Sequence, residues 1–273
     1  MKVLCSRAEQ SQSLFLMAAG LLLTTVIIEP SFAQGCGSNA DAPIATDRPQ
    51  ITNSSIVVPC GSLQLENGFE VSGNVSNAGI DLPETSLRYG ILRKTEVRLA
   101  LPNYFAANAV SAGVGGGSGD IVLGLKQQLG PVHGFDVSII PNISLPSGSD
   151  TRSSHGYDPG FQVPLSRALT KNWTAAGQLG LASPTTLTGR VITGQASVYF
   201  DRQITAPLDA YVEYSGAYPQ QGGPQHLIDF GGALKVRHRQ QLDFHCGFGL
   251  SSATTAYTVG LGYSVRLPAF RAS

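Results

Sequence analysis

Apolar and polar side chains alternate along most of the chain from Gly61 onward, most clearly between Gly119 and Pro146. Two runs with a period of two are separated there by a Gly-Pro pair. The apolar positions of these runs are Ile121, Leu123, Leu125 and Leu129, then Phe135, Val137, Ile139, Ile143 and Leu145. Since successive side chains of a β-strand point to opposite faces, the pattern predicts a hairpin with one apolar and one polar surface.

The same alternation recurs in about twelve segments. Each segment is close to the roughly ten residues that a tilted strand needs to cross a lipid bilayer. The apolar series run over residues 63–71, 85–91, 97–101, 121–129, 135–145, 161–165, 173–181, 196–200, 208–214, 228–236, 242–250 and 257–265.

The connections between these segments alternate in length. Short links occur at residues 92–94, 130–133, 169–172, 202–206 and 237–240, and longer Gly/Ser/Pro/Asn-rich links at 103–118, 146–157, 183–193 and 217–225. Tight turns on one side, longer loops on the other and an even strand number are typical of an outer-membrane barrel. A soluble β-sandwich could use the same alternation but has no reason to segregate loop lengths. We therefore predict an all-β fold over residues 61–273, a transmembrane, antiparallel, up-and-down β-barrel in a bacterial outer membrane.

Residues 1–33 have the three parts of a secretory signal peptide. A basic start is followed by an apolar run over residues 14–28 and by a small-x-small sequence over residues 31–33. An uncleaved anchor helix is the alternative, but the apolar run is short for a spanning helix. We predict cleavage here and a mature start near Gln34.

Residues 34–60 are predicted to form a periplasmic arm, because this stretch is rich in Asp, Asn, Ser and Pro and lacks sustained periodicity. The arm either lines the mouth of a pore or is mobile, and we prefer the mobile arm. Cys36 and Cys60 bracket it and are candidates for a disulfide in an oxidising compartment.

The composition narrows the function. The chain has 18 basic and 18 acidic residues, so no net charge draws it toward nucleic acid. Only 13% of the residues are charged, while 32 are glycine, which favours an all-β chain with many turns. No Cys or His spacing suggests a metal site, and we expect no cofactor.

The polar face of the predicted barrel carries both acidic and basic residues. If the apolar side chains of each strand face lipid, the polar side chains that alternate with them face the lumen. Acidic residues outnumber basic residues among these polar positions. The predicted lumen residues are Glu66, Glu70, Arg88, Glu96, Arg98, Asp120, Lys126, Asp136, Asp201, Asp209, Glu213, Asp229, Lys235, Asp243, His245 and Arg266. One interpretation is a solvated, salt-bridged wall that holds the barrel's shape. The other is a water-filled path with a mild preference for cations or neutral polar solutes.

Evidence for catalysis in the sequence is thin. Asp243 and His245 share the inner face of one predicted strand, and a serine in the lumen could complete a hydrolase-like trio. Neither GxSxG nor HExxH occurs in the sequence. We assign no catalytic residues and expect no enzyme.

A set of short motifs resembles a bacterial outer-membrane family. The motifs are Thr46-Asp47-Arg48-Pro49, Leu63-Gln64-Leu65-Glu66-Asn67-Gly68, Pro83-Glu84-Thr85, Leu87-Arg88-Tyr89-Gly90, Glu96-Val97-Arg98-Leu99, Gly124-Leu125-Lys126, Leu145-Pro146-Ser147-Gly148-Ser149 and Tyr157-Asp158-Pro159-Gly160. The family is that of transporter-like proteins labelled as a meta-pathway of phenol degradation, and the similarity extends to about residue 181. The resemblance implies a barrel that passes small, aromatic or hydrophobic compounds.

The sequence as a whole therefore predicts a passive channel or a transporter-like barrel. Its expected partners are outer-membrane lipids, the barrel-assembly machinery during biogenesis and an unidentified small solute. A non-conducting barrel with a structural or surface-interaction role is the alternative, and an outer-membrane hydrolase is a third.

Overall fold

The computed structural model describes residues 42–74, 77–107 and 116–267. All of these belong to the unit Cys36–Ser273. The unit Met1–Gly35, which contains the predicted signal peptide, lies outside the described residues. In the part of the chain described, no helix is long and apolar enough to span a membrane.

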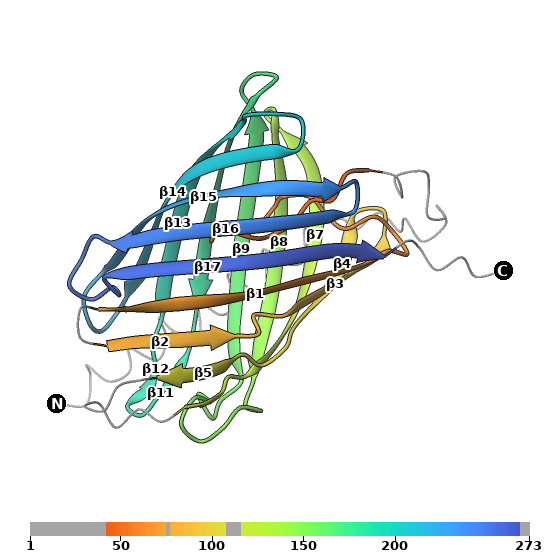
Figure 1. The fold of residues 1–273 in the computed structure, drawn as a ribbon. Coiled ribbons are helices and arrows are strands. Elements are labelled where there is room, and N and C mark those ends of the chain that lie inside the picture. Colours follow the sequence, from red (N-terminus) through yellow and green to blue (C-terminus); the bar gives the residue numbers. More distant parts are fainter. Residues whose placement is uncertain (1–41, 75–76, 108–115, 268–273) are drawn as a thin grey trace. The chain divides into compact units, whose positions relative to one another are not determined.

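Antiparallel strands form one closed wall (Figure 1). The first strand is β1 (Leu63–Asn74). Each of the next three strands of the wall is interrupted and consists of two pieces: β2 (Asn77–Leu82) and β3 (Ser86–Leu92), β4 (Thr95–Ala100) and β5 (Tyr104–Ala107), and β6 (Gly117–Ser118) and β7 (Ile121–Val132). The other strands are β8 (Phe135–Leu145), β9 (Asp158–Ala168), β10 (Trp173–Ala182), β13 (Thr193–Gln203), β14 (Leu208–Pro219), β15 (Gln225–Arg237), β16 (Gln240–Gly249) and β17 (Tyr257–Leu267). Pairing of β17 with β1 closes the barrel. With each interrupted pair counted once, the wall has twelve strands, which confirms the prediction.

Proline explains two of the three interruptions. Pro83 separates β2 from β3, and Pro102 separates β4 from β5. Because proline has no N–H to donate, it cannot continue the ladder of an interior strand. The sequence pattern identified β3 and β4 but not the short pieces β2 and β5 beyond these breaks.

The two faces of the wall have opposite character. On the outside, Leu123, Val198 and Leu261 are 41%, 43% and 50% exposed. On the inside, the side chains of Arg88 and Lys126 are completely buried. A protein folded in water would bury the apolar set and expose the charged one, so this inverted arrangement matches a barrel whose outer face contacts lipid.

Five tight connections lie at one end of the barrel, which we call the short-turn end. They join β3 to β4, β7 to β8, β9 to β10, β13 to β14 and β15 to β16. The opposite loop end carries the longer links, and one of these contains the small hairpin β11 (Thr185–Thr186) and β12 (Gly189–Arg190). The predicted segregation of loop lengths is present.

Residues 42–60, which we call the plug, differ from the expectation of a mobile arm. Ile44, Val57 and Val58 are 4%, 6% and 2% exposed, and Thr52 is 1% exposed. Apart from a single bridge at Cys60, no described residue of the plug pairs with a strand, and the polar side chains of the plug instead contact the inward residues of the wall.

Candidate functional site: the plug inside the barrel lumen

The plug enters and leaves the lumen at the short-turn end. Near its start, the backbone N–H of Ile44 donates to the carbonyl of His238 in the β15–β16 turn at 3.0 Å. The guanidinium of Arg266 donates to the carbonyls of Ala42 and Pro43. At its other end, Cys60 forms a bridge with Gly90 near the end of β3. The plug is therefore a re-entrant loop whose middle residues reach into the barrel.

Asp47 is the charged centre of the plug. Its carboxylate lies 3.1 Å from Nζ of Lys126 and 3.4 Å from the guanidinium of Arg88, and it also contacts Arg98. Burial acts to raise the pKa of Asp47, but the charges of Arg88, Arg98 and Lys126 together hold that pKa well below its usual value. Asp47 is therefore ionised and joins strands β3, β4 and β7 through one side chain.

Two wall carboxylates complete this cluster. Glu96 accepts two hydrogen bonds from Arg88, at 2.8 and 3.0 Å, and a third from the backbone N–H of Val58 at 2.6 Å. Glu66 lies 2.8 Å from Arg88 and accepts a 3.0 Å hydrogen bond from the backbone N–H of Asp47. Three carboxylates thus face three cations, so the cluster neutralises itself.

Arg48 anchors the plug beside the Asp47 cluster, against β16, β17 and β1. Its guanidinium lies 2.5 Å from Glu84 and 3.4 Å from Asp243. Gly68 and Gly262 leave room for it, because a Cβ atom at either position would collide with the guanidinium. The pKa of Arg48 is raised: burial acts to lower it, but the neighbouring carboxylates, led by Glu84, outweigh burial.

The middle of the plug, residues 51–55, which we call the apex, contacts wall residues about midway along the barrel. The carboxylate of Glu213 on β14 accepts hydrogen bonds from the N–H groups of Ile51 and Thr52, both at 2.8 Å, and from the Thr52 hydroxyl at 2.6 Å. On nearby strands of the same stretch of wall, Asn53 binds Gln178 on β10, and the hydroxyl of Ser55 lies 2.7 Å from the hydroxyl of Ser166 on β9. Inward side chains of one contiguous stretch of the wall, from β9 to β14, therefore hold the apex.

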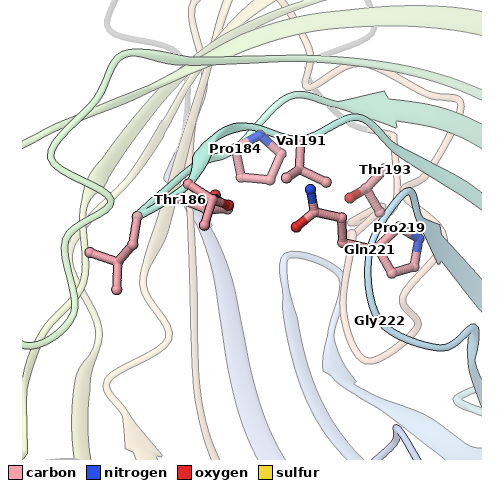
Figure 2. A pocket seen from close by; sticks show the side chains of 9 residues that line it. Pro184, Thr186, Val191, Thr193, Pro219, Gln221 and Gly222 are labelled. Carbon is pink, nitrogen blue, oxygen red and sulfur yellow. The ribbon is translucent and has the colours of Figure 1, made fainter.

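Beyond the apex, toward the loop end, the lumen holds a cavity of about 310 Å³, which we call the vestibule. Its lining contains no charged residue and consists of Ile51, Gln162, Gln178, Gln195, Ala196, Ser197, Ser215, Gly216, Ala217, Gln225, Leu227 and Thr254. A second pocket of about 480 Å³ lies closer to the loop tips (Figure 2). The lumen is thus divided into a charged, occupied half and an uncharged cavity.

A second polar cluster occupies the wall between β14 and β16. The hydroxyl of Tyr211 donates a 2.5 Å hydrogen bond to Asp229, whose other oxygen lies 3.4 Å from Nδ1 of His245. Nε2 of His245 lies 4.0 Å from Glu70. Asp243, the neighbour of His245 in the sequence-based trio, instead faces Arg48. Within the described residues, no serine or threonine hydroxyl bonds to the His245 ring, so the hydrolase-like trio is not assembled.

Four of the remaining predicted lumen residues lie near the short-turn end. Asp209 and Lys235 form a pair at 2.7 Å on neighbouring strands β14 and β15. Asp201 lies near Asp209 at the short-turn end of the barrel. Asp136 is the second residue of β8 and also lies at the short-turn end.

Asp120 departs from the predicted role, because it lies outside the strands at the loop end. It accepts hydrogen bonds from the backbone N–H groups of Ser147, Gly148 and Ser154. Burial acts to raise the pKa of Asp120, but these hydrogen bonds, chiefly that from Gly148, lower it. Asp120 therefore organises the loop between β8 and β9.

The residues that sequence reasoning missed belong to the plug. Asp47, Arg48, Thr52 and Asn53 make most of its contacts with the wall, yet none was assigned to the lumen. The available signal was the Thr46-Asp47-Arg48-Pro49 motif, which contributed only to the family resemblance.

Cys60 is disulfide-bonded, while Cys246 is free. Cys36 lies outside the described residues, so the pairing of Cys36 with Cys60 stays a prediction. No cluster of three or more His, Cys, Asp or Glu side chains suited to a metal ion occurs in the described ranges.

The barrel is closed, has twelve strands and is apolar outside, and the charged half of its lumen is occupied by a segment that precedes the first strand. These features define the class as plugged β-barrels of the outer-membrane type. The chain belongs to the family described as "Putative MetA-pathway of phenol degradation", whose model matches residues 46–267. This membership confirms the resemblance inferred from the motifs.

Solved structures of similar fold are outer-membrane channels and porins. The COG4313 outer membrane channel from Pseudomonas putida F1 has a TM-score of 0.62 at 11% identity, covering 80% of this chain and 100% of that one. The NanC porin has a TM-score of 0.54 at 12% identity, covering 75% of this chain and 100% of that one. The KdgM porin has a TM-score of 0.50 at 10% identity, covering 74% and 98%. No curated protein matches the sequence. At these identities the likeness concerns the fold.

Proposed function

We propose that the protein is a passive outer-membrane channel that its own plug holds closed and that opens when the plug leaves the lumen. The apolar outer face of the wall supports the membrane location, with lipids as its surroundings and the barrel-assembly machinery as its partner during biogenesis. The fold shared with outer-membrane channels is consistent with this function.

The observation that carries the proposal is the way in which the plug is attached. Between residues 45 and 58, no backbone-to-backbone hydrogen bond joins the described plug to a strand, and side chains make the contacts. Twelve paired strands close the wall without the plug. Withdrawal of the plug therefore leaves the ladder of the wall intact.

A reversible lock tests this proposal. The hydroxyl oxygens of Ser55 and Ser166 lie 2.7 Å apart, which suits a disulfide if both residues become cysteine. In a Cys246→Ser background, we expect oxidised Ser55→Cys/Ser166→Cys protein to show fewer openings in planar bilayers than the same protein after reduction. The background protein receives the same reductant as a matched control, because reduction also opens the disulfide at Cys60. Equal conductance of locked and reduced channels contradicts the proposal.

The alternative function is a non-conducting structural barrel. It is favoured by the self-neutralising cluster around Asp47, which leaves no obvious ionic path through the short-turn half. Replacement of residues 45–58 by a Gly/Ser linker of the same length separates the two functions. A channel then conducts continuously and lets small solutes swell liposomes, whereas a structural barrel does neither.

We infer no hydrolase activity, because His245 pairs with Asp229 and Glu70 rather than with a hydroxyl nucleophile. The preference for aromatic or hydrophobic solutes, which the family resemblance implies, stays a proposal drawn from the family alone.

A further inference from the structure

We propose that the vestibule is a recognition site for small, uncharged solutes rich in hydroxyl groups, such as monosaccharides and polyols. The inference rests on the proposed channel function, because the vestibule is where a solute entering from the loop end first meets the apex of the plug. It adds a solute class that the family resemblance does not imply.

The size of the vestibule suits a small solute. Its volume of about 310 Å³ corresponds to roughly ten water molecules. Four glutamines, two serines and one threonine supply most of the lining. The charged residues of the plug, Asp47 and Arg48, are not part of the lining. The cavity therefore offers many hydrogen bonds and no counter-charge.

Asn53 fixes the direction of two of these glutamines. The backbone N–H of Asn53 donates to Oε1 of Gln178 at 3.1 Å, which settles the amide orientation because a backbone N–H can only donate. Nδ2 of Asn53 donates to the same oxygen at 2.8 Å and to Oε1 of Gln162 at 3.2 Å. The Asn53 carbonyl accepts from Arg98 at 2.8 Å, so its own orientation is also settled. Both glutamine carbonyls are thus occupied, and both amide nitrogens remain available to a solute.

Other groups of the lining also remain available. The side chains of Gln195, Ser215 and Gln225 form no hydrogen bond within the described part of the chain, and each can both donate and accept. Hydroxyl groups of a solute also donate and accept, so they can replace water at these positions one for one. An apolar solute would instead leave these amides without partners.

The absence of charge from the lining argues against ionic solutes. A carboxylate or ammonium group that enters the vestibule loses hydration and gains only neutral dipoles. Arg98, the nearest cation in the chain of hydrogen bonds through Asn53, already contacts Asp47. An uncharged solute has no comparable cost.

The pocket nearer the loop tips gives access to the vestibule. Thr193 and Pro219 line it and are paired in the register of β13 and β14 (Figure 2). Gln195 and Ala217, each two residues from this pair in the direction of the short-turn end, are also paired and line the vestibule. Since alternate residues of a strand share a face, both cavities lie on the lumen side of the same two strands. The first pocket also contains Leu187 and Val191, so a solute passes an apolar rim before it reaches the amides.

Three probes of matched size test the solute class. D-glucose, D-glucuronate and D-glucosamine are titrated calorimetrically into the full protein, in a detergent without a sugar headgroup. We expect saturable, millimolar binding of glucose and binding of the two charged probes that is at least about tenfold weaker. Glucuronate or glucosamine binding as tightly as glucose overturns the proposal, and so does the absence of saturable glucose binding.

Two variants locate the site. Gln178→Glu retains acceptors for Asn53 but replaces the free amide donor with a charged acceptor. Gln195→Ala removes a side chain that has no hydrogen-bond partner among the described residues. We expect each to weaken glucose binding about three- to tenfold. Gln203→Ala is the control, because Gln203 lies at the short-turn end, where its amide binds the carbonyl of Ala206. Unchanged binding in both vestibule variants overturns the assignment.

The calorimetric result is independent of conduction. If glucose binds as expected but the Gly/Ser-linker protein does not conduct, the channel function fails while the recognition site stands. If the linker protein conducts but glucose does not bind, only the recognition site fails.

Discussion

The hydroxyl group of Thr52 donates a 2.6 Å hydrogen bond to the carboxylate of Glu213, at the apex of the plug. The same carboxylate accepts the backbone N–H groups of Ile51 and Thr52. One wall residue thus holds the apex by three bonds, and its loss affects the position of the plug more than that of any strand.

Thr52→Val tests this anchor with little change in volume. Loss of a hydrogen bond to a buried carboxylate weakens plug closure by about 1–3 kcal/mol, so we expect more frequent openings in planar bilayers. Ser54→Ala is a suitable control, because within the described ranges the Ser54 hydroxyl bonds only to the neighbouring backbone N–H of Ile56. Identical opening frequencies in Thr52→Val and the unmodified protein show that the hydroxyl bond to Glu213 does not hold the plug closed.

Asp47→Asn removes the negative centre of the plug and leaves Arg88, Arg98 and Lys126 facing one carboxylate fewer. Breaking a buried ion pair from one side costs about 3–5 kcal/mol. We expect the plug to spend more time outside the lumen, so that a cysteine introduced at Ser55 reacts faster with a water-soluble maleimide. Labelling at an unchanged rate shows that these charges do not retain the plug.

Plug retention is also expected to depend on pH. The pKa of Asp47 in the folded protein lies below its ordinary value of 3.8, so the carboxylate's contribution is complete above about pH 4 and is lost as the pH falls further. Maleimide labelling does not suit acidic buffers, so cleavage of the plug by pepsin between pH 5 and pH 2 is the measurement. Cleavage rises as the pH falls in the unmodified protein, whereas Asp47→Asn is expected to lack the part of this rise that comes from residue 47. Identical pH profiles contradict the prediction.

Leu261→Arg tests the lipid-facing surface. Leu261 lies near the middle of β17 and is half exposed, so arginine there faces hydrocarbon and costs about 2–4 kcal/mol. We expect less folded barrel in lipid vesicles at intermediate urea, measured by the gel shift of the heat-modifiable form. Leu187→Arg, at the fully exposed tip of the β11–β12 hairpin, should have no effect. Equal stability of both variants argues against a membrane-embedded wall.

The predicted Cys36–Cys60 disulfide has a direct chemical test. Peptide mapping without reduction should recover one cross-linked peptide that contains both residues, and alkylation should modify only Cys246 among the cysteines after residue 33. Cys36→Ser should then expose Cys60 to alkylation. A Cys60 that remains blocked in this variant shows that another thiol is its partner.

The outward surface was predictable from the sequence because its cause is local. A strand alternates its side chains with a period of two, so Leu123, Val198 and Leu261 identify the lipid-facing series without knowledge of any neighbour. The strand number and the short turns follow from the same rhythm. Proline at 83 and 102 hid two strand pieces, because the alternation restarts after each break.

The partners of the lumen residues were not predictable in this way. His245 was expected beside Asp243, two residues away on the same strand, but it pairs with Asp229 on β15. That contact depends on the register between β15 and β16, in which His245 lies opposite Gly231 and therefore diagonally across from Asp229. A strand's own pattern carries no information about this register.

The sequence by itself determined that the chain forms a twelve-stranded barrel with an apolar exterior, since alternation and turn spacing are properties of neighbouring residues. Only the tertiary structure decided that the lumen is occupied. The plug has no periodicity, and its contacts join residues far apart along the chain, such as Asn53 with Gln178 and Thr52 with Glu213. These contacts exist because closure of the barrel brings inward side chains from many strands around one segment, and no local pattern records that convergence.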